Sequence, residues 1–228
     1  MRATWLGVAL ALVGAIPALA DDDAKAMAVI AAAKAATGGA AWDAIPGWHE
    51  TGSHGGVAYE AWLDLRTWGM ASQDSRGGLT QEERFDGQVV WVKSFDGHAG
   101  ADQSAAALAA ARQSDYLSAR GYFFPDRFGA QFAYQSVQTV AKKAYDVVRV
   151  TPDGAGPVDL WFDQTTHLLA KEVIQGDAPQ TILLDDYRKV GGIMAPYHLT
   201  VGAEEGHVGG VAFEPVDRAR FSAPPGGE

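Results

Sequence analysis

The sequence predicts an α+β protein built on a large curled antiparallel sheet of about 11–12 strands, an incomplete barrel. An N-terminal helix and one internal helix are expected against the concave side of this sheet. Three observations predict this architecture. Apolar and polar residues alternate through most of the chain, 27 Gly and 10 Pro fall between these runs as turn signals, and two Ala-rich stretches with capping residues interrupt them. A strongly twisted sheet of this size curls, so a half-barrel follows.

Two segments are predicted to be helical. The first spans residues 22–36, where the aspartates at 21–23 offer an N-cap and a favourable charge at the positive end of the helix dipole, and a Gly-Gly pair ends it. The second spans residues 105–119, with Asp102 or Ser104 as its cap. Because this helix interrupts the run of strands, it is the natural plug or lid for the concave side.

The strands follow a period of two. Residues 57–66 alternate between apolar and polar side chains, which is typical of a half-buried strand. Asp-Gly pairs at 86–87 and 96–97 mark hairpin turns, and short connections favour an antiparallel meander. After the internal helix, strands are expected at residues 131–137, 145–151, 158–162, 168–175, 180–187, 197–202 and 208–214.

Residues 1–20 have the order of a secretory signal peptide. Arg2 supplies a positive charge, residues 5–16 form an apolar run, and an Ala-Leu-Ala cleavage triplet ends at Ala20. The apolar run is shorter than the ~20 residues that a membrane span needs. We therefore expect cleavage after Ala20, a periplasmic or secreted product, and no membrane anchor.

Composition narrows the function classes. The formal net charge of -10 opposes adsorption to nucleic acid or to anionic lipid headgroups. The chain has no cysteine, which excludes disulfides, a thiolate nucleophile, a zinc–cysteine cluster and acylation at a lipobox. Without repeats or low-complexity linkers, the mature chain is predicted to form one domain over residues 21–222, followed by a disordered tail at 223–228.

No catalytic constellation is recognisable. The six histidines are scattered singly along the chain, and none belongs to an H-E-x-x-H motif. Residues 52–55 (Gly-Ser-His-Gly) read as a hairpin loop rather than a nucleophile elbow. Adjacent carboxylates, such as those at 204–205, point to opposite faces of a strand and cannot form a dyad. The sequence therefore predicts a protein that is not an enzyme and that uses no cofactor and no metal.

Trp62 and Trp161 lie among acidic residues on the polar faces of their strands. Two interpretations remain open for them. Either another element or the rim of the sheet covers these rings, or they are exposed contacts for a partner.

Several short strings along the chain are distinctive. They are residues 35–39 (Ala-Ala-Thr-Gly-Gly) with 41–43 (Ala-Trp-Asp), 84–91 (Arg-Phe-Asp-Gly-Gln-Val-Val-Trp), 159–163 with 166–169, 186–193 with Pro196, and 221–224 (Phe-Ser-Ala-Pro). These strings resemble a bacterial periplasmic family with the lipoprotein-carrier (LolA/LolB-like) fold. The resemblance covers most of the mature chain and implies a half-barrel. The same strings also resemble the N-terminal region of bacterial secreted aspartyl-protease-like proteins, but the Asp-Thr/Ser-Gly triplet of the protease domain is absent here, so no protease activity is implied.

The resemblance implies a non-catalytic binding protein that holds a lipid, an acyl chain, a lipoprotein or another apolar ligand in the half-barrel. The alternative is an accessory module that binds a protein or peptide through a sheet edge or exposed aromatic rings. Arg112, on the internal helix, is the candidate for the arginine that locks the lid of lipoprotein carriers. Alternation turns one set of side chains toward the concave side, where they either line a pocket or form a packed core. The candidate ligand-binding residues are Tyr59, Leu63, Leu108, Arg112, Phe132, Tyr134, Leu160 and Phe162.

Overall fold

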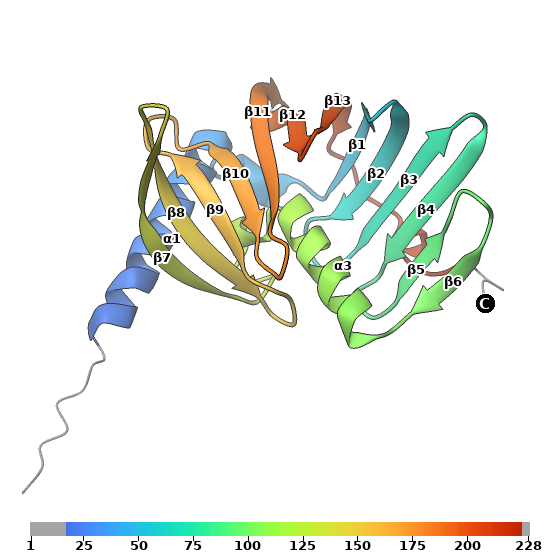
Figure 1. Cartoon of the computed structure of the whole chain (residues 1–228), viewed down its shortest axis with the longest axis horizontal. Helices are drawn as coiled ribbons and strands as arrows, with labels where there is room; N and C mark the ends of the chain where they lie inside the picture. Colours follow the sequence, from blue (N-terminus) through green and yellow to red (C-terminus); the bar gives the residue numbers. More distant parts are fainter. Residues whose placement is uncertain (1–16, 225–228) are drawn as a thin grey trace, which may run out of the picture.

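The computed structural model of the chain describes residues 17–224, and the side chains from residue 22 onward. Three α-helices, two short 3-10 helices and thirteen strands make up this part of the chain (Figure 1). The elements are α1 (Pro17–Thr37), α2 (Ala41–Ala44), β1 (Gly47–His54), β2 (Val57–Asp64), β3 (Met70–Arg76), β4 (Leu79–Phe85), β5 (Val90–Lys93), β6 (Ala99–Asp102), α3 (Ala105–Ser118), η1 (Gly121–Phe123), β7 (Ala130–Val140), β8 (Lys143–Pro152), β9 (Val158–Asp163), β10 (Leu169–Ile174), β11 (Gln180–Val190), β12 (Ile193–Val201), β13 (Glu204–Ala212) and η2 (Arg218–Phe221).

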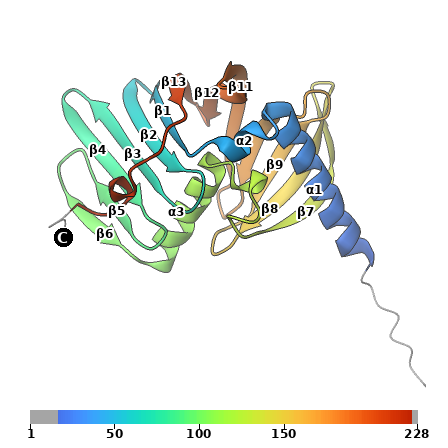
Figure 2. The same ribbon diagram turned by 180° about the vertical axis from the view of Figure 1, so that it is seen from behind.

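All described strands belong to one open antiparallel sheet of 13 strands, in the order β6-β5-β4-β3-β2-β1-β13-β12-β11-β10-β9-β8-β7. The chain runs outward from β1 to the edge at β6, crosses through α3 to the opposite edge at β7, and returns strand by strand to β13, which pairs with β1. α3 lies across the concave side between the two halves of the sheet (Figure 1), and α1 runs along β7 and β8 (Figure 2). The predicted incomplete barrel with two helices is therefore confirmed, with slightly more strands than expected.

The internal helix begins where the sequence predicts. Ser104 is its N-cap, and the Ser104 hydroxyl accepts a hydrogen bond of 3.2 Å from the backbone N–H of Ala107. The cap satisfies one of the backbone donors left free at a helix start. The choice between Asp102 and Ser104 is thereby settled, although Asp102 still accepts a hydrogen bond from the backbone N–H of Ser104.

The first helix differs from its prediction at the N-terminal end. It begins at Pro17 rather than at residue 22, so the aspartates at 21–23 lie inside the helix and do not cap it. The reason is that the Ala-Leu-Ala triplet before them is itself a strong helix former. Residues 1–16 of the predicted signal peptide and residues 225–228 of the predicted tail lie outside the described residues. Among residues 17–224, no helix combines the length and the apolar character that a membrane crossing requires.

The main core lies between the concave face of β8–β10 and the elements that cover it. Val148, Leu160 and Phe162 point inward from the sheet and are at most 2% exposed. They share one buried cluster with Ile30 of α1 and Tyr122 of η1. A smaller cluster, formed by Phe85, Val90 and Ala111, packs α3 against β4 and β5. The helices are therefore packed against both halves of the sheet. A site can lie between these two clusters, over the middle strands.

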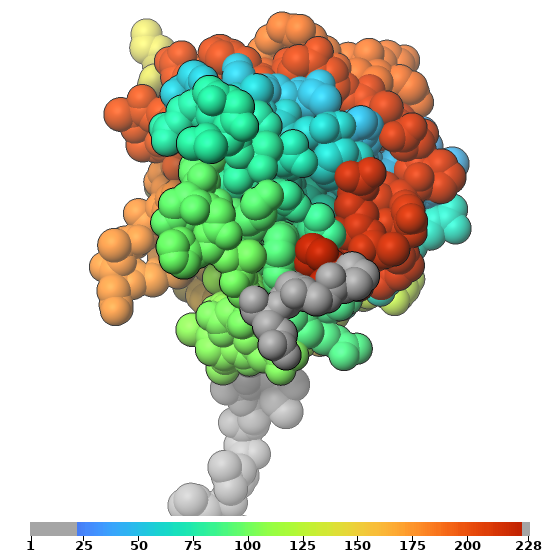
Figure 3. All heavy atoms as spheres, turned by 90° about the vertical axis from the view of Figure 1, so that its right-hand side faces the viewer, coloured from blue at the N-terminus to red at the C-terminus, as the bar shows by residue number. Residues whose placement is uncertain are grey.

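The C-terminal segment runs across the other half of the sheet and contacts β3 and β4 through η2 (Figure 2); in Figure 3 its red atoms lie beside the green and teal atoms of that half. Phe221 of η2 is 1% exposed, and a Cβ added to Gly69 would lie 2.6 Å from its ring. Gly69 is required here because no larger side chain fits between the β2–β3 turn and this ring.

Candidate functional site

A cleft opens on the concave face between α3 and the middle strands of the sheet. Its volume is about 490 Å³, which lies within the range of small-molecule sites. The walls come from β1–β4 on one side and from β12 and β13 on the other, while α3 contributes Ser114 and Ser118. Strands that are distant in the sequence meet here because β1 pairs with β13. The apolar part of the lining includes Trp48, Leu63, Met70, Leu199 and Val208.

Acidic side chains dominate the polar part of the lining. Glu50, Asp74, Glu83 and Glu204 come from four different strands, β1, β3, β4 and β13. They face the cleft because each stands an even number of residues from another inward-facing side chain of its strand, as Glu204 does from Val208. The cleft thus combines two kinds of lining: the apolar side chains, here called the floor, and these four carboxyl groups, here called the rim.

His54, the last residue of β1, lies between two of these carboxylates. Its Nδ1 is 2.8 Å from Glu204 Oε1, and its Nε2 is 3.4 Å from Asp74 Oδ1. The hydrogen bond with Glu204 raises the pKa of His54 above its ordinary 6.5; partial burial opposes this shift, and Asp74 adds to it. The two carboxylates therefore extend the pH range over which His54 stays protonated, and the protonated ring offsets part of the negative charge at the rim.

Two further carboxyl groups of the lining differ in their surroundings. Glu50 accepts a hydrogen bond of 2.5 Å from the Tyr59 hydroxyl and one of 3.1 Å from the Trp48 indole N–H, which hold it against the wall. Burial raises the pKa of Glu83, and the nearby Asp74 raises it further. A cationic or hydrogen-bond-donating group at the rim would relieve this crowding of carboxylates.

A second groove, of about 370 Å³, lies on the other side of α3 against β10–β12. Four residues line both the groove and the cleft: Ser114, Ser118, Arg120 and Leu199. α3 therefore divides one concave surface into two connected spaces. Arg120 follows α3 with a left-handed φ of 54°, and its guanidinium donates a 2.7 Å hydrogen bond to the Leu117 carbonyl. Arg120 therefore lines the boundary between the two spaces, apart from the apolar side chains of the cleft.

The structure separates the eight predicted ligand-binding residues into several places. Tyr59 and Leu63 line the cleft. The other six lie elsewhere. Leu160 and Phe162 are packed in the main core, and Phe132 and Tyr134 pack around it, with Lys25 of α1 over the Tyr134 ring. Leu108 packs against the cluster that contains Phe85. Arg112 lies near Gly154 in the β8–β9 turn. Alternation predicted the inward faces, but the helices fill the concave side at β7–β9 and leave it open only at the middle strands.

Both tryptophans on the outer face are covered by neighbouring side chains. Trp62 stacks on His49 at 5.1 Å, and the guanidinium of Arg220 from η2 lies 3.9 Å from its ring centre. Lys171 lies 3.0 Å above Trp161. For Trp62, this favours the first of the two interpretations, a ring covered by another element. For Trp161, the cover comes from the neighbouring strand.

The sequence reasoning missed most of the cleft. The sequence predicts His54 in a hairpin loop and the adjacent carboxylates Glu82 and Glu83 at a solvated strand edge, and it gives no signal for Asp74. The one available signal was alternation itself: on β1, the residues two and six positions after Trp48 are Glu50 and His54. That signal shows which residues share a face, but it does not reveal that this face borders an open space.

The comparisons with known proteins concern the fold. No family model and no curated protein matches this sequence. Similar solved structures include a LolA superfamily protein from Nitrosomonas europaea, with 11% identity, a TM-score of 0.58, and coverage of 87% of this chain and 97% of that one. A domain described as an outer-membrane lipoprotein-sorting protein from Vibrio parahaemolyticus has the same identity and TM-score and covers 88% and 97%. A DUF1329 family protein from Desulfovibrio piger has 10% identity, a TM-score of 0.54, and coverage of 88% and 97%. The chain therefore has the LolA-like fold that its motifs resemble.

Proposed function

We propose that this chain is an exported binding protein that holds an amphipathic ligand in the cleft beside α3, with an apolar chain on the floor and a cationic or hydrogen-bond-donating head at the rim. The observation that carries the proposal is the combination of an apolar floor and an acidic rim in one cleft of about 490 Å³. The similar solved structures include a lipoprotein-sorting domain, and the fold they share supports a carrier of this general kind.

The apolar chain alone supplies only part of a useful affinity. Burying roughly ten methylene groups contributes about 8 kcal/mol, against an association cost of at least about 4 kcal/mol. The chain by itself therefore supports at best roughly millimolar binding, and contacts between the head group and the carboxylates supply the rest. The groove on the other side of α3 offers a continuation for a longer chain, because Leu199 lines both spaces.

Binding of fluorescent alkyl probes tests this proposal. Two probes of equal chain length, one with an ammonium head and one with a carboxylate head, are titrated into the purified chain. We expect saturable binding of one probe per chain, with the ammonium probe about tenfold tighter because the carboxylates at the rim attract it. Leu199→Gln, which places an amide on the apolar floor, is expected to weaken both probes by about tenfold.

Leu183→Gln is the matched control, because Leu183 lies on the neighbouring strand and is 45% exposed. It should bind both probes like the original chain, and circular dichroism should show that both variants are folded. Absence of saturable binding, or equal binding by Leu199→Gln, would refute the carrier proposal and favour the alternative of a protein- or peptide-binding module. Tighter binding of the carboxylate probe would refute the proposed head-group chemistry.

Export is tested by the N-terminus of the product. A protein recovered from the periplasm or the medium of an expressing bacterium is expected to begin at Asp21, because the charge, the apolar run and the Ala-Leu-Ala triplet have the order that signal peptidase recognises. Intact mass and N-terminal sequencing measure this directly. Recovery of residues 1–20 on the exported product would contradict it.

A further inference from the structure

Two histidines that are separate in the sequence meet on the outer face of the sheet. His198 on β12 and His207 on β13 are directly opposed in the antiparallel register. Their rings stack with centres 4.9 Å apart and planes 18° from parallel. They face away from the cleft, because the cleft is lined by Leu199 and Gly206, their neighbours along each strand. Two histidines that are single in the sequence are therefore neighbours in the fold.

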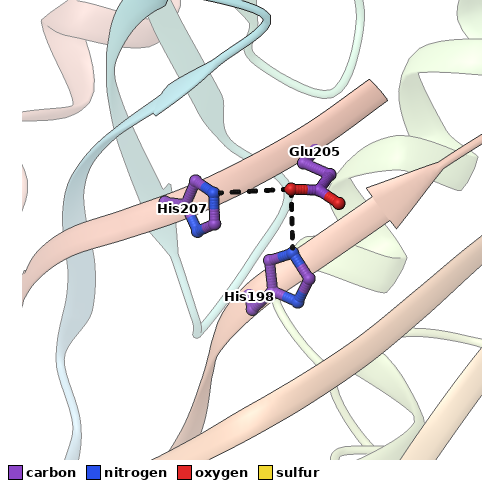
Figure 4. Close-up of side chains that lie close together, drawn as sticks. All are labelled: His198, Glu205 and His207. Carbon is purple, nitrogen blue, oxygen red and sulfur yellow. Dashed lines mark ion pairs between the residues drawn. The ribbon is translucent and has the colours of Figure 1, made fainter. Parts of the chain in front are cut away.

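A carboxylate completes the group. Glu205 stands two residues before His207 on the same face of β13, and its Oε2 is 3.9 Å from the Nε2 of His198 and 3.9 Å from the Nε2 of His207 (Figure 4). One donor atom from each of the three residues lies within 4.8 Å of the others. Two imidazole nitrogens and one carboxylate oxygen from two neighbouring strands thus lie close together.

A fourth residue orients one of the imidazoles. Asp185, opposite His198 on β11, accepts a hydrogen bond of 2.7 Å at Oδ1 from the Nδ1 of His198. This bond fixes the proton of the neutral ring on Nδ1 and leaves the lone pair of Nε2 free to point at Glu205. Metal-binding histidines usually donate their other ring N–H to a carboxylate, a backbone carbonyl or a water, and Asp185 is such a partner.

Two other histidines of the sheet contact carboxylates. His49 uses its two ring nitrogens for two carboxylates, Glu60 at 2.7 Å and Glu214 at 3.1 Å. His54 likewise bridges Asp74 and Glu204. His198 also has a carboxylate at each ring nitrogen, Asp185 and Glu205. What distinguishes it, among the residues that the structure describes, is a second imidazole, that of His207, beside the shared carboxylate.

We propose that His198, Glu205 and His207 bind a divalent transition-metal ion of the zinc class, with Asp185 as the positioning residue. The donor set of two imidazoles and one carboxylate is the type that zinc takes at sites with an open fourth position. Zinc ligands lie about 2.0–2.2 Å from the ion, so neighbouring donors of a tetrahedral site are about 3.3 Å apart. The present separations close to that value by small side-chain rotations, which cost little packing because Glu205 and His207 side chains are 64% and 61% exposed.

Calorimetric titration of Zn²⁺ into the chain, free of any histidine tag, tests this site. We expect saturable binding of one ion per chain. His198→Ala and His207→Ala are each expected to weaken the affinity at least tenfold, and Asp185→Asn by about tenfold through the loss of ring orientation. Co²⁺ substituted for zinc should give the visible absorption of a tetrahedral site, and His207→Ala should abolish it.

His98→Ala is the matched control, because His98 is an 88% exposed histidine beside an aspartate, Asp96, at 3.1 Å. Its titration should be indistinguishable from that of the original chain. The proposal is overturned if zinc does not bind saturably, or if His207→Ala binds zinc as tightly as the original chain does. Circular dichroism of each variant guards against misfolding, and Glu205→Gln, which keeps the shape of the side chain, provides an independent ligand test.

Discussion

Replacing Phe162 with alanine is expected to lower the free energy of unfolding by about 3–5 kcal/mol. Phe162 is 2% exposed, and its ring meets that of Tyr122 edge to face at 6.2 Å. It belongs to the cluster that joins α1 and η1 to the sheet. The surrounding elements are held by other contacts of this cluster, so they cannot collapse fully into the space that the ring leaves. The cost of the remaining cavity therefore adds to the transfer free energy that is lost with the ring.

Urea denaturation followed by circular dichroism measures this loss. Leu199→Ala is the comparison, because Leu199 is only partly buried: it packs against the edge of the core and also lines the open cleft, where solvent can enter. We expect it to cost less than half as much as Phe162→Ala. Equal costs at the two positions would contradict the division of the concave side into a packed part and an open part.

The alternation of apolar and polar residues predicts most of the strands, but it does not predict β3, and the reason is physical. β3 reads Met-Ala-Ser-Gln-Asp-Ser-Arg and has no apolar alternation. Its inward-facing Ser72 and Asp74 border the cleft rather than a packed core, so polar residues are tolerated on the face that is usually apolar. The strand is held instead by its ladders to β2 and β4. The failure of the pattern thus coincides with the opening on the concave side.

The candidate sites were less predictable because they depend on which distant strands become neighbours. Alternation alone predicted that Glu204 and Glu205 point to opposite faces, and they do: one lines the cleft, and the other approaches His198 and His207. Neither partner follows from spacing along the chain. The partners depend on the pairing of β13 with both β1 and β12, and on a register shift near Thr51 in the first of these ladders.

Asp115→Asn is expected to become progressively more stable relative to the original chain as the pH rises from 5 to 8. Asp115 lies on α3 and is 0% exposed. Its Oδ2 accepts a 2.9 Å hydrogen bond from the backbone N–H of Gly69, and its Oδ1 has no hydrogen-bond partner among the described residues. Burial raises the pKa of Asp115 from 3.8 to about 7; the Gly69 N–H opposes this shift, and the nearby Asp64 adds to it.

The direction of the pH effect follows from this raised pKa. The folded chain holds the Asp115 proton more tightly than the unfolded chain does. Below about pH 4 both states keep the proton, and Asp115 does not lower the free energy of unfolding. As the pH rises, this free energy falls, and the loss reaches its full value above about pH 7. Between pH 5 and pH 8 the cost grows by about 2–3 kcal/mol. Asparagine keeps the acceptor for Gly69 but does not ionise, and its unpaired amide adds a cost that does not vary with pH.

Urea denaturation at pH 5, 6, 7 and 8 gives the difference in unfolding free energy between Asp115→Asn and the original chain, from which the titration of all other groups cancels. This difference should move in favour of the variant by about 2–3 kcal/mol across the range. Asp177→Asn, at an exposed aspartate between β10 and β11, is the control and should run parallel to the original chain. A difference that stays constant with pH for Asp115→Asn would mean that Asp115 is already ionised in the folded chain at pH 5, and that its burial does not hold the proton.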